Sequence, residues 1–121
     1  MKNYNIEELC NNFEESCEKM KEATLSGDYK TNNREDKNIK KILKIFEKDK
    51  IVAEKCIEIL FNSLNPVTIT EIATYCLAND YKVACAENIL NVLADEKQNG
   101  IFGFNAKMTL KVWKEKGSIR I

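Results

Sequence analysis

The chain alternates apolar and polar positions with the period of an α-helix over most of its length. Between residues 6 and 25, apolar side chains recur every three or four positions, at Ile6, Leu9, Phe13, Cys17, Met20 and Ala23. Glutamates fill many of the intervening positions, as they do on the solvent side of an amphipathic helix. The pattern predicts a first helix that ends near Ser26, Gly27 and Asp28, because glycine readily adopts the left-handed conformation that closes a helix.

The middle of the chain predicts three more helices. Asn32 or Asn33 is placed to cap the second helix, and a charged bend at residues 47–50 separates it from the third. Asn65 and Pro66 predict the start of the fourth, because asparagine is a good N-cap and proline suits the first helical position. The apolar faces of these helices are Ile39, Ile42, Leu43 and Phe46; Ile51, Val52, Cys56, Ile59 and Leu60; and Ile69, Ile72, Ala73, Cys76 and Leu77.

Two further helices are predicted toward the C-terminus. Asp80 is placed to cap the fifth, Asn105 to cap the sixth and Gly117 to close the sixth. Trp113 lies at helical spacing from other apolar residues and is interpreted as a core residue. The expected apolar faces are Val83, Ala86, Leu90 and Leu93 for the fifth helix, and Ala106, Thr109, Leu110 and Trp113 for the sixth.

These elements predict an all-α protein with a single helical domain over residues 1–121. The segments 39–60 and 66–94 each read as an antiparallel helical hairpin, which favours a short HEAT-like stack of about six antiparallel helices. An irregular helical bundle is the alternative. The polar, acidic N-terminal segment lacks the apolar run of a signal peptide, and no apolar segment is long enough to span a membrane, so we expect a cytoplasmic protein.

The residue types present argue against catalysis. The sequence contains no histidine, the commonest general base, and no nucleotide-binding glycine motif or hydrolase nucleophile motif. We therefore predict no enzymatic activity, no metal site and no cofactor. The five cysteines are an odd number without C-x-x-C spacing, and four of them are interpreted as buried thiols on apolar helix faces, with a redox role as the alternative.

Charge is balanced overall but segregated along the chain. Nineteen basic residues match nineteen acidic ones, so the total charge favours neither nucleic acid nor an anionic membrane as partner. The segment 29–55 and the C-terminal segment 101–121 are basic, whereas 1–28 and 56–100 are acidic. The lysine run of the predicted second helix is interpreted first as a solvated helix face.

Two short motifs resemble those of a bacterial family of uncharacterised helical domains with HEAT-like folds. The first is G-D-Y-K-x-x-N, at residues 27–33, and the second is G-F-x-A-x-x-T-L-x-x-W, at residues 103–113. The resemblance implies an immunity protein, encoded beside a toxin of contact-dependent inhibition and blocking that toxin. Within the second motif, Gly103 is expected to permit a turn, Asn105 to cap, and Phe104 to seal the last helix on the core.

We therefore expect a monomeric immunity protein that covers the active site of a cognate toxin, such as a nuclease. An acidic surface with aromatic anchors could oppose a basic nuclease cleft. The candidate partner-binding residues are Glu71, Tyr75, Asp80, Tyr81, Glu87, Asp95 and Glu96. A helical adaptor that inhibits nothing is the alternative, and nucleic-acid binding through residues 37–55 and the C-terminal basic helix is a weaker one.

Overall fold

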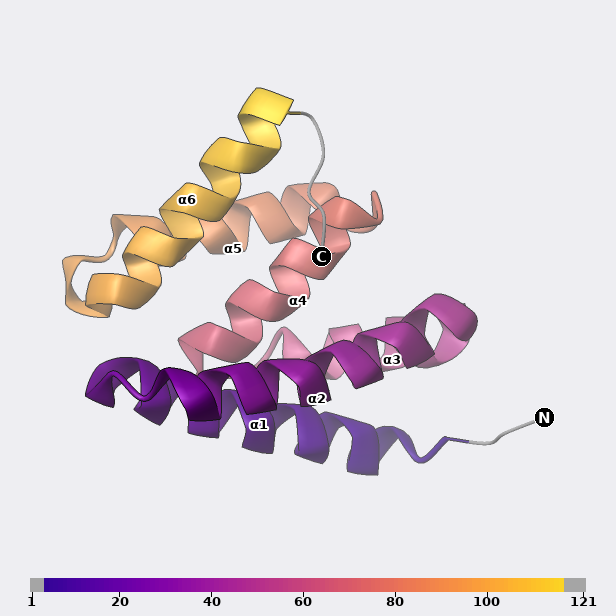
Figure 1. Cartoon of the computed structure of the whole chain (residues 1–121). Coiled ribbons are helices and arrows are strands. Elements are labelled where there is room, and N and C mark those ends of the chain that lie inside the picture. Colours follow the sequence, from indigo (N-terminus) through magenta and orange to yellow (C-terminus); the bar gives the residue numbers. More distant parts are fainter. Residues whose placement is uncertain (1–3, 117–121) are drawn as a thin grey trace. The chain divides into compact units, whose positions relative to one another are not determined.

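The computed structural model describes residues 4–116, except for the side chain of Gln98. Over that range the chain forms six α-helices and one short 3-10 helix, and no β-strand (Figure 1). The prediction of an all-α fold is confirmed. The elements are α1 (Ile6–Ser26), α2 (Tyr29–Lys48), α3 (Lys50–Leu60), α4 (Pro66–Ala78), α5 (Val83–Asp95), η1 (Lys97–Asn99) and α6 (Gly100–Lys116).

The chain divides into two compact units, Met1–Thr68 and Ile69–Ile121, so the boundary falls inside α4. In the first unit, each of α1, α2 and α3 packs against the other two. In the second unit, α5 packs along α6 and η1 contacts both. The expectation of one folding unit stays a prediction.

The junction between α1 and α2 is tighter than the sequence suggested. Gly27 has a φ of 77° and closes α1, as predicted. Asp28 then caps α2: its carboxylate accepts the backbone N–H of Thr31 at 3.1 Å and the hydroxyl of Thr31 at 2.7 Å. The predicted caps Asn32 and Asn33 are wrong, because Asp28 satisfies the first N–H groups and the polar stretch becomes the first turns of α2.

The first unit closes around side chains from all three of its helices. Those at less than 2% exposure are Phe13, Cys17, Ile39, Phe46, Cys56, Ile57 and Leu60, together with Thr68. In α3 the buried face differs from the predicted one, because Ala53 and Ile57 turn inward while Ile51 and Ile59 are exposed. Two apolar arcs compete on this helix, and contact with α1 and α2 selects the arc that contains Ala53.

The turn between α4 and α5 also departs from expectation. Asp80 does not cap α5; the N-cap position belongs to Lys82, whose side chain makes no capping hydrogen bond. Both residues have positive φ, 52° for Asp80 and 48° for Lys82, which is the left-handed region. At the other end of α4, Asn65 accepts the N–H of Val67 at 2.9 Å, so the predicted start at Pro66 is confirmed.

The last helix begins earlier than predicted. Gly100, with a φ of 52°, makes the turn, and α6 starts there. Gly103 and Asn105 therefore lie within the helix, and their predicted roles as turn and cap are wrong. Gly103 is buried, and a Cβ added to it would stand 2.9 Å from the carbonyl oxygen of Leu93, so it permits close packing of α6. The predicted closing residue, Gly117, lies outside the described residues.

Candidate partner-binding surfaces

The two aromatic residues of the predicted acidic surface are not exposed anchors. Tyr75, on α4, is only 3% exposed, so its ring is not available to a partner. Tyr81 is half-buried, and the ammonium of Lys82 lies 5.7 Å from its ring centroid. This cation–π contact places a positive charge at the aromatic group that was expected to work with acids. Glu71, also on α4, is half-buried.

The remaining predicted residues are spread along α5. Glu87 and Asp95 are eight positions apart and thus about 12 Å apart along the helix axis. Asp80 precedes α5 and Glu96 follows it, so both lie at its ends. Asp80, Asp95 and Glu96 are exposed and Glu87 is half-buried. The structure therefore keeps these acids accessible, but it does not gather them into one compact patch.

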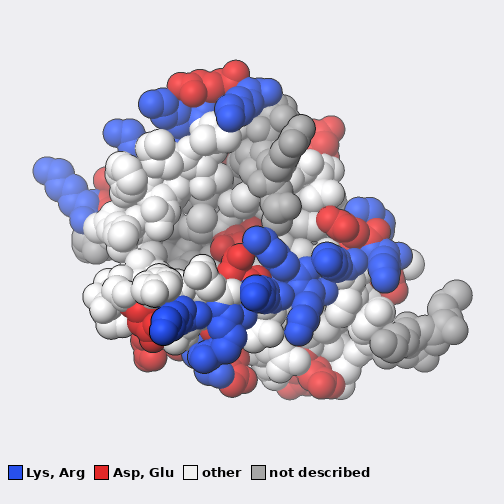
Figure 2. All heavy atoms as spheres, viewed as in Figure 1, with Lys and Arg blue, Asp and Glu red and all other residues white. Residues whose placement is uncertain are grey.

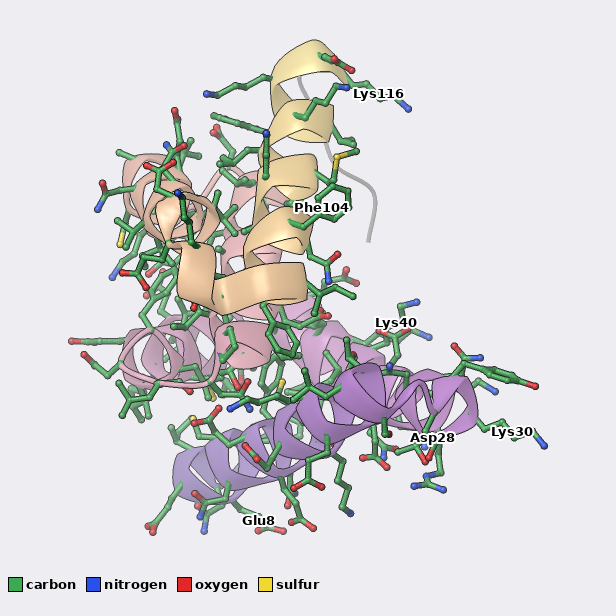
Figure 3. The ribbon with its side chains drawn as sticks, turned by 90° about the vertical axis from the view of Figure 1, so that its left-hand side faces the viewer. Glu8, Asp28, Lys30, Lys40, Phe104 and Lys116 are labelled. Atoms are coloured by element: carbon green, nitrogen blue, oxygen red, sulfur yellow. The ribbon has the colours of Figure 1, made fainter. Side chains whose placement is uncertain are left out.

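An apolar stripe runs along the exposed side of α6. Its members are Ile101, Phe104, Met108 and Val112, which are 48%, 60%, 38% and 37% exposed. Steps of three and four residues place them on one side of the helix. Figure 3 shows Phe104 pointing away from α5, so the expectation that it seals α6 on the core is wrong. The inward face of α6 is formed instead by Phe102, Gly103, Ala106 and Leu110.

The apolar stripe has a groove on one side and lysines on the other. Met108 and Val112 line a shallow groove of about 380 Å³ with Asn105, Thr109 and Thr74 of α4. On a helical projection, the exposed residues Lys107, Lys111 and Lys114 follow the opposite border of the stripe. Trp113, which was expected in the core, is half-buried at the end of this helix. Sequence reasoning missed the stripe, although its spacing was visible.

A basic stripe runs along α2. It consists of Lys30, Arg34, Lys37, Lys41, Lys44 and Lys48, all exposed and spaced alternately by four and three residues. At 100° per residue, this spacing keeps the six side chains within an arc of about 80°. Figure 2 shows the blue atoms of basic side chains following α2 across the face in view. The acids of α2, namely Glu35, Asp36 and Glu47, lie off this arc.

Few ion pairs neutralise the basic stripe. Within residues 4–116, Arg34 is its one member in an ion pair, with its Nε 3.1 Å from a carboxylate oxygen of Glu35. A further ion pair of α2 joins Asp36 to Lys40 at 2.9 Å, and Lys40 lies beside the stripe. Figure 3 shows Glu8 of α1 and Lys40 of α2 pointing in opposite directions, whereas Glu15 of α1 lines a hollow together with Lys41 of the stripe.

The buried carboxylate of Glu35 fixes the helix beneath the basic stripe. Glu35 is 4% exposed and accepts hydrogen bonds from Arg34, from Ser16 of α1 and from Asn38, the last at 3.2 Å. Burial by itself would raise the pKa of Glu35, but these donors favour the charged form and the net pKa is lowered. The group therefore links α1 to α2 as a carboxylate.

A second carboxylate, that of Glu14 on α1, organises the segment before α4. It accepts hydrogen bonds from the hydroxyl of Ser63, at 2.8 and 2.9 Å, and from the hydroxyl of Thr68. The Ser63 hydroxyl in turn accepts the backbone N–H of Asn65 at 3.0 Å. The acid is thus used to hold the chain between α3 and α4, and it is a structural group in this unit.

The cysteines of the chain differ in burial. All five are free thiols; Cys10, Cys17, Cys56 and Cys76 are buried, and Cys85 is exposed. Burial raises the pKa of Cys56 and of Cys76 to about 12, so both are protonated at neutral pH. The prediction that four cysteines are buried thiols is confirmed.

Comparison with models of protein families, with curated proteins and with solved structures finds no match to this chain. The family resemblance of the segments 27–33 and 103–113 stays a prediction. Between residues 4 and 116, no helix is both long and apolar enough to cross a lipid bilayer. The same range contains no group of three or more histidine, cysteine, aspartate or glutamate side chains that could hold a metal ion.

Proposed function

We propose that this protein works by binding and blocking another protein, as the immunity protein of a bacterial toxin. The observation that supports this most is the apolar stripe of α6. Four large apolar side chains in a row on one helix form an exposed patch of the kind that marks protein interaction sites. Burying one such side chain completely contributes about 1.5–3 kcal/mol, which favours a partner that covers the whole row.

The surroundings of the apolar stripe fit an interface with a protein. Stable interfaces have an apolar centre and a polar rim. Lys107, Lys111 and Lys114 supply such a rim on one side, and Asn105 and Thr109 supply it on the other. Inhibition by covering an active site needs contact area and no acid–base group, which agrees with a sequence that contains no histidine.

The proposal also includes the acidic residues along α5 as part of the partner-binding surface. Glu87 and Asp95 are the groups that would oppose a basic nuclease cleft, with Asp80 and Glu96 at the two ends of the helix. Tyr75 is left out because it is buried, and Tyr81 because its ring already faces Lys82. The toxin as partner, and nuclease activity in particular, come from the resemblance of the two sequence motifs.

Co-expression with the product of the adjacent gene tests the proposal. We expect the two proteins to co-purify and the adjacent product to arrest growth unless this protein is present. The double variant F104S/M108S should lose both the complex and the rescue, whereas V92S, which removes an isolated exposed side chain of α5, should keep both. Absence of a complex together with absence of rescue would reject the proposal.

A binding adaptor that inhibits nothing is the second candidate. It is favoured by a specific observation: the chain carries two exposed helix surfaces of different chemistry, apolar on α6 and basic on α2. An inhibitor needs one surface, whereas an adaptor connects two partners. A stable complex that requires Phe104 but gives no growth rescue would favour the adaptor.

A further inference from the structure

The basic stripe of α2 concentrates positive charge in a protein whose total charge is zero. Six basic residues lie in one line, and the arc they occupy contains no acidic residue. Like charges at spacings of three and four residues destabilise a helix slightly, by about 0.2–0.5 kcal/mol per pair. This line of charge works mildly against helix stability, so helix stability does not account for it.

We propose that the basic stripe binds the phosphate backbone of nucleic acid without reading its sequence. From Lys30 to Lys48 the helix rises by about 27 Å, and successive members of the stripe are about 4.5–6 Å apart along the axis. One strand of a duplex carries a phosphate about every 3.4 Å, or about eight over the same length. Because each strand winds around the duplex, the phosphates that face α2 come from both strands, and six flexible cations along one line can contact those phosphates.

The absence of base-reading groups defines the kind of recognition. The aromatic residues of α2 are Tyr29, at its first position and outside the arc of the stripe, and Phe46, which is buried. Within this helix the stripe therefore offers no stacking platform for unpaired bases. Lysine acts as a point charge without the fork geometry that reads guanine, so contacts to phosphate dominate.

A lipid surface fits the stripe less well. A helix that lies on a membrane inserts apolar side chains beside its basic ones. The apolar side of α2 is already used, because Ile39, Ile42, Leu43 and Phe46 are buried in the first unit. The helix could therefore contact a membrane through its charges only, without inserting apolar side chains.

An acidic protein surface also fits less well than a nucleic acid. Each exposed ion pair between proteins contributes only about 0–1 kcal/mol. A nucleic acid adds the release of condensed counterions for every phosphate that is neutralised, which makes six cations in a row far more effective. This inference does not rest on the proposed inhibitor function, because the basic stripe and the apolar stripe lie on different helices and in different units.

Fluorescence anisotropy of the full chain with a labelled 24-base-pair DNA of mixed sequence tests the inference. With six phosphate contacts, we expect the affinity to fall by about 10³-fold between 50 and 200 mM salt. The variant K37E/K41E/K44E should bind at least about 30-fold more weakly at 50 mM salt. The neutral variant K37Q/K41Q/K44Q should lower the slope of log affinity against log salt by about 3.

A control variant with the same change of net charge as K37E/K41E/K44E separates the effect of the stripe from the effect of total charge. K82E/K97E/K116E replaces exposed lysines outside residues 29–55 and should keep the DNA affinity within about threefold. Circular dichroism should give the same helical content for all four proteins, because every substituted side chain is exposed.

Three results would overturn the inference. The first is no binding by the unmodified chain at 50 mM salt. The second is an equal loss of affinity in the stripe and control variants, which would mean that total charge alone is responsible. The third is displacement of the DNA by an equal charge concentration of poly-L-glutamate or of phosphatidylserine vesicles, which would assign the stripe to an acidic protein or a membrane.

Discussion

The outward sides of α2 and α6 both contain lysines, but they differ in what lies between those lysines. On α2 the basic residues are neighbours of one another, and Tyr29 at the first position is the one large apolar side chain that is exposed. On α6 the lysines border a row of four exposed apolar side chains. The two helices therefore present different chemistry to a partner, although both are rich in lysine.

This difference shows that the kind of partner a lysine-rich helix binds depends on the residues that lie beside its lysines. Where cations stand alone, binding depends on counterion release and is lost as salt rises. Where cations border apolar side chains, the apolar area dominates the affinity and the cations act mainly on the rate of association. Salt is consequently the first variable that separates the two surfaces.

The largest expected effect is the difference in salt dependence. Between 50 and 200 mM salt, DNA binding through α2 should weaken by about 10³-fold, whereas binding of a protein partner through α6 should change by less than about tenfold. Titrations of both complexes in the same buffers measure this. Equal salt slopes would remove the distinction between the two helices.

The next effect concerns the apolar stripe itself. F104S/M108S should weaken the complex with a protein partner by about 10²-fold, because a loss of about 1.4 kcal/mol at each of two apolar anchors corresponds to about tenfold each. DNA binding should stay unchanged, and K37E/K41E/K44E should show the reverse pattern. If either variant impairs both activities, the surfaces are not independent.

Gly103 tests how the apolar stripe is held outward. G103A should lower the free energy of unfolding by about 1–3 kcal/mol, because the added methyl group meets the Leu93 carbonyl oxygen at 2.9 Å and overpacks the contact of α5 with α6. This loss is expected although alanine is the better helix former. Urea denaturation measures it, and N105A, at an exposed site of the same helix, is the control. A stability gain in G103A would show that α6 can move away from α5.

Glu35 tests how the basic stripe is supported. E35Q should lower the free energy of unfolding at pH 7 by about 1 kcal/mol, because a neutral amide accepts more weakly from Arg34 and Asn38. The pKa of Glu35 is lowered from 4.5, so its contribution is present above that pH and is lost as the pH falls through the lower value of the folded state. The difference between E35Q and the unmodified chain should therefore vanish in acid. E22Q, at an exposed site of α1, should show no difference at either pH.

The smallest expected effect is the change in the free energy of unfolding when a residue of the apolar stripe is replaced. F104S should change the free energy of unfolding by no more than about 0.5 kcal/mol, since the side chain is mostly exposed and serine and phenylalanine have similar helix propensities. Thermal denaturation measures this change. A loss of several kcal/mol would mean that Phe104 packs inside the chain, and the apolar stripe would then no longer be a partner surface.

The predicted partner surface shows why site prediction lagged behind fold prediction. Glu71 and Tyr75 share a helix with apolar residues, and their exposure depends on how that helix is covered. Tyr75 is buried, so an anchor expected at the surface is absent from it. Phe104 shows the opposite error, because a residue expected in the core is exposed. Periodicity identifies a face, but it does not state whether that face meets protein or water.

The sequence alone determined the features that arise within a few residues of one another. Gly27 ends α1 and Pro66 begins α4, because backbone conformation and capping are local effects. The all-α fold class follows in the same way from helical periodicity, and the lysine run from Lys37 to Lys48 was visible at once.

Only the tertiary structure decided which residue caps a helix and which side of a helix is buried. Asp28, and not Asn32 or Asn33, caps α2, and this brings Lys30 and Arg34 into line with the lysines that follow. On α6, which is apolar on two sides, packing against α5 selected the side with Gly103 and left Phe104 in water. The reason is physical: a helix forms from contacts within itself, but the side that it buries is chosen by the shape of its neighbours.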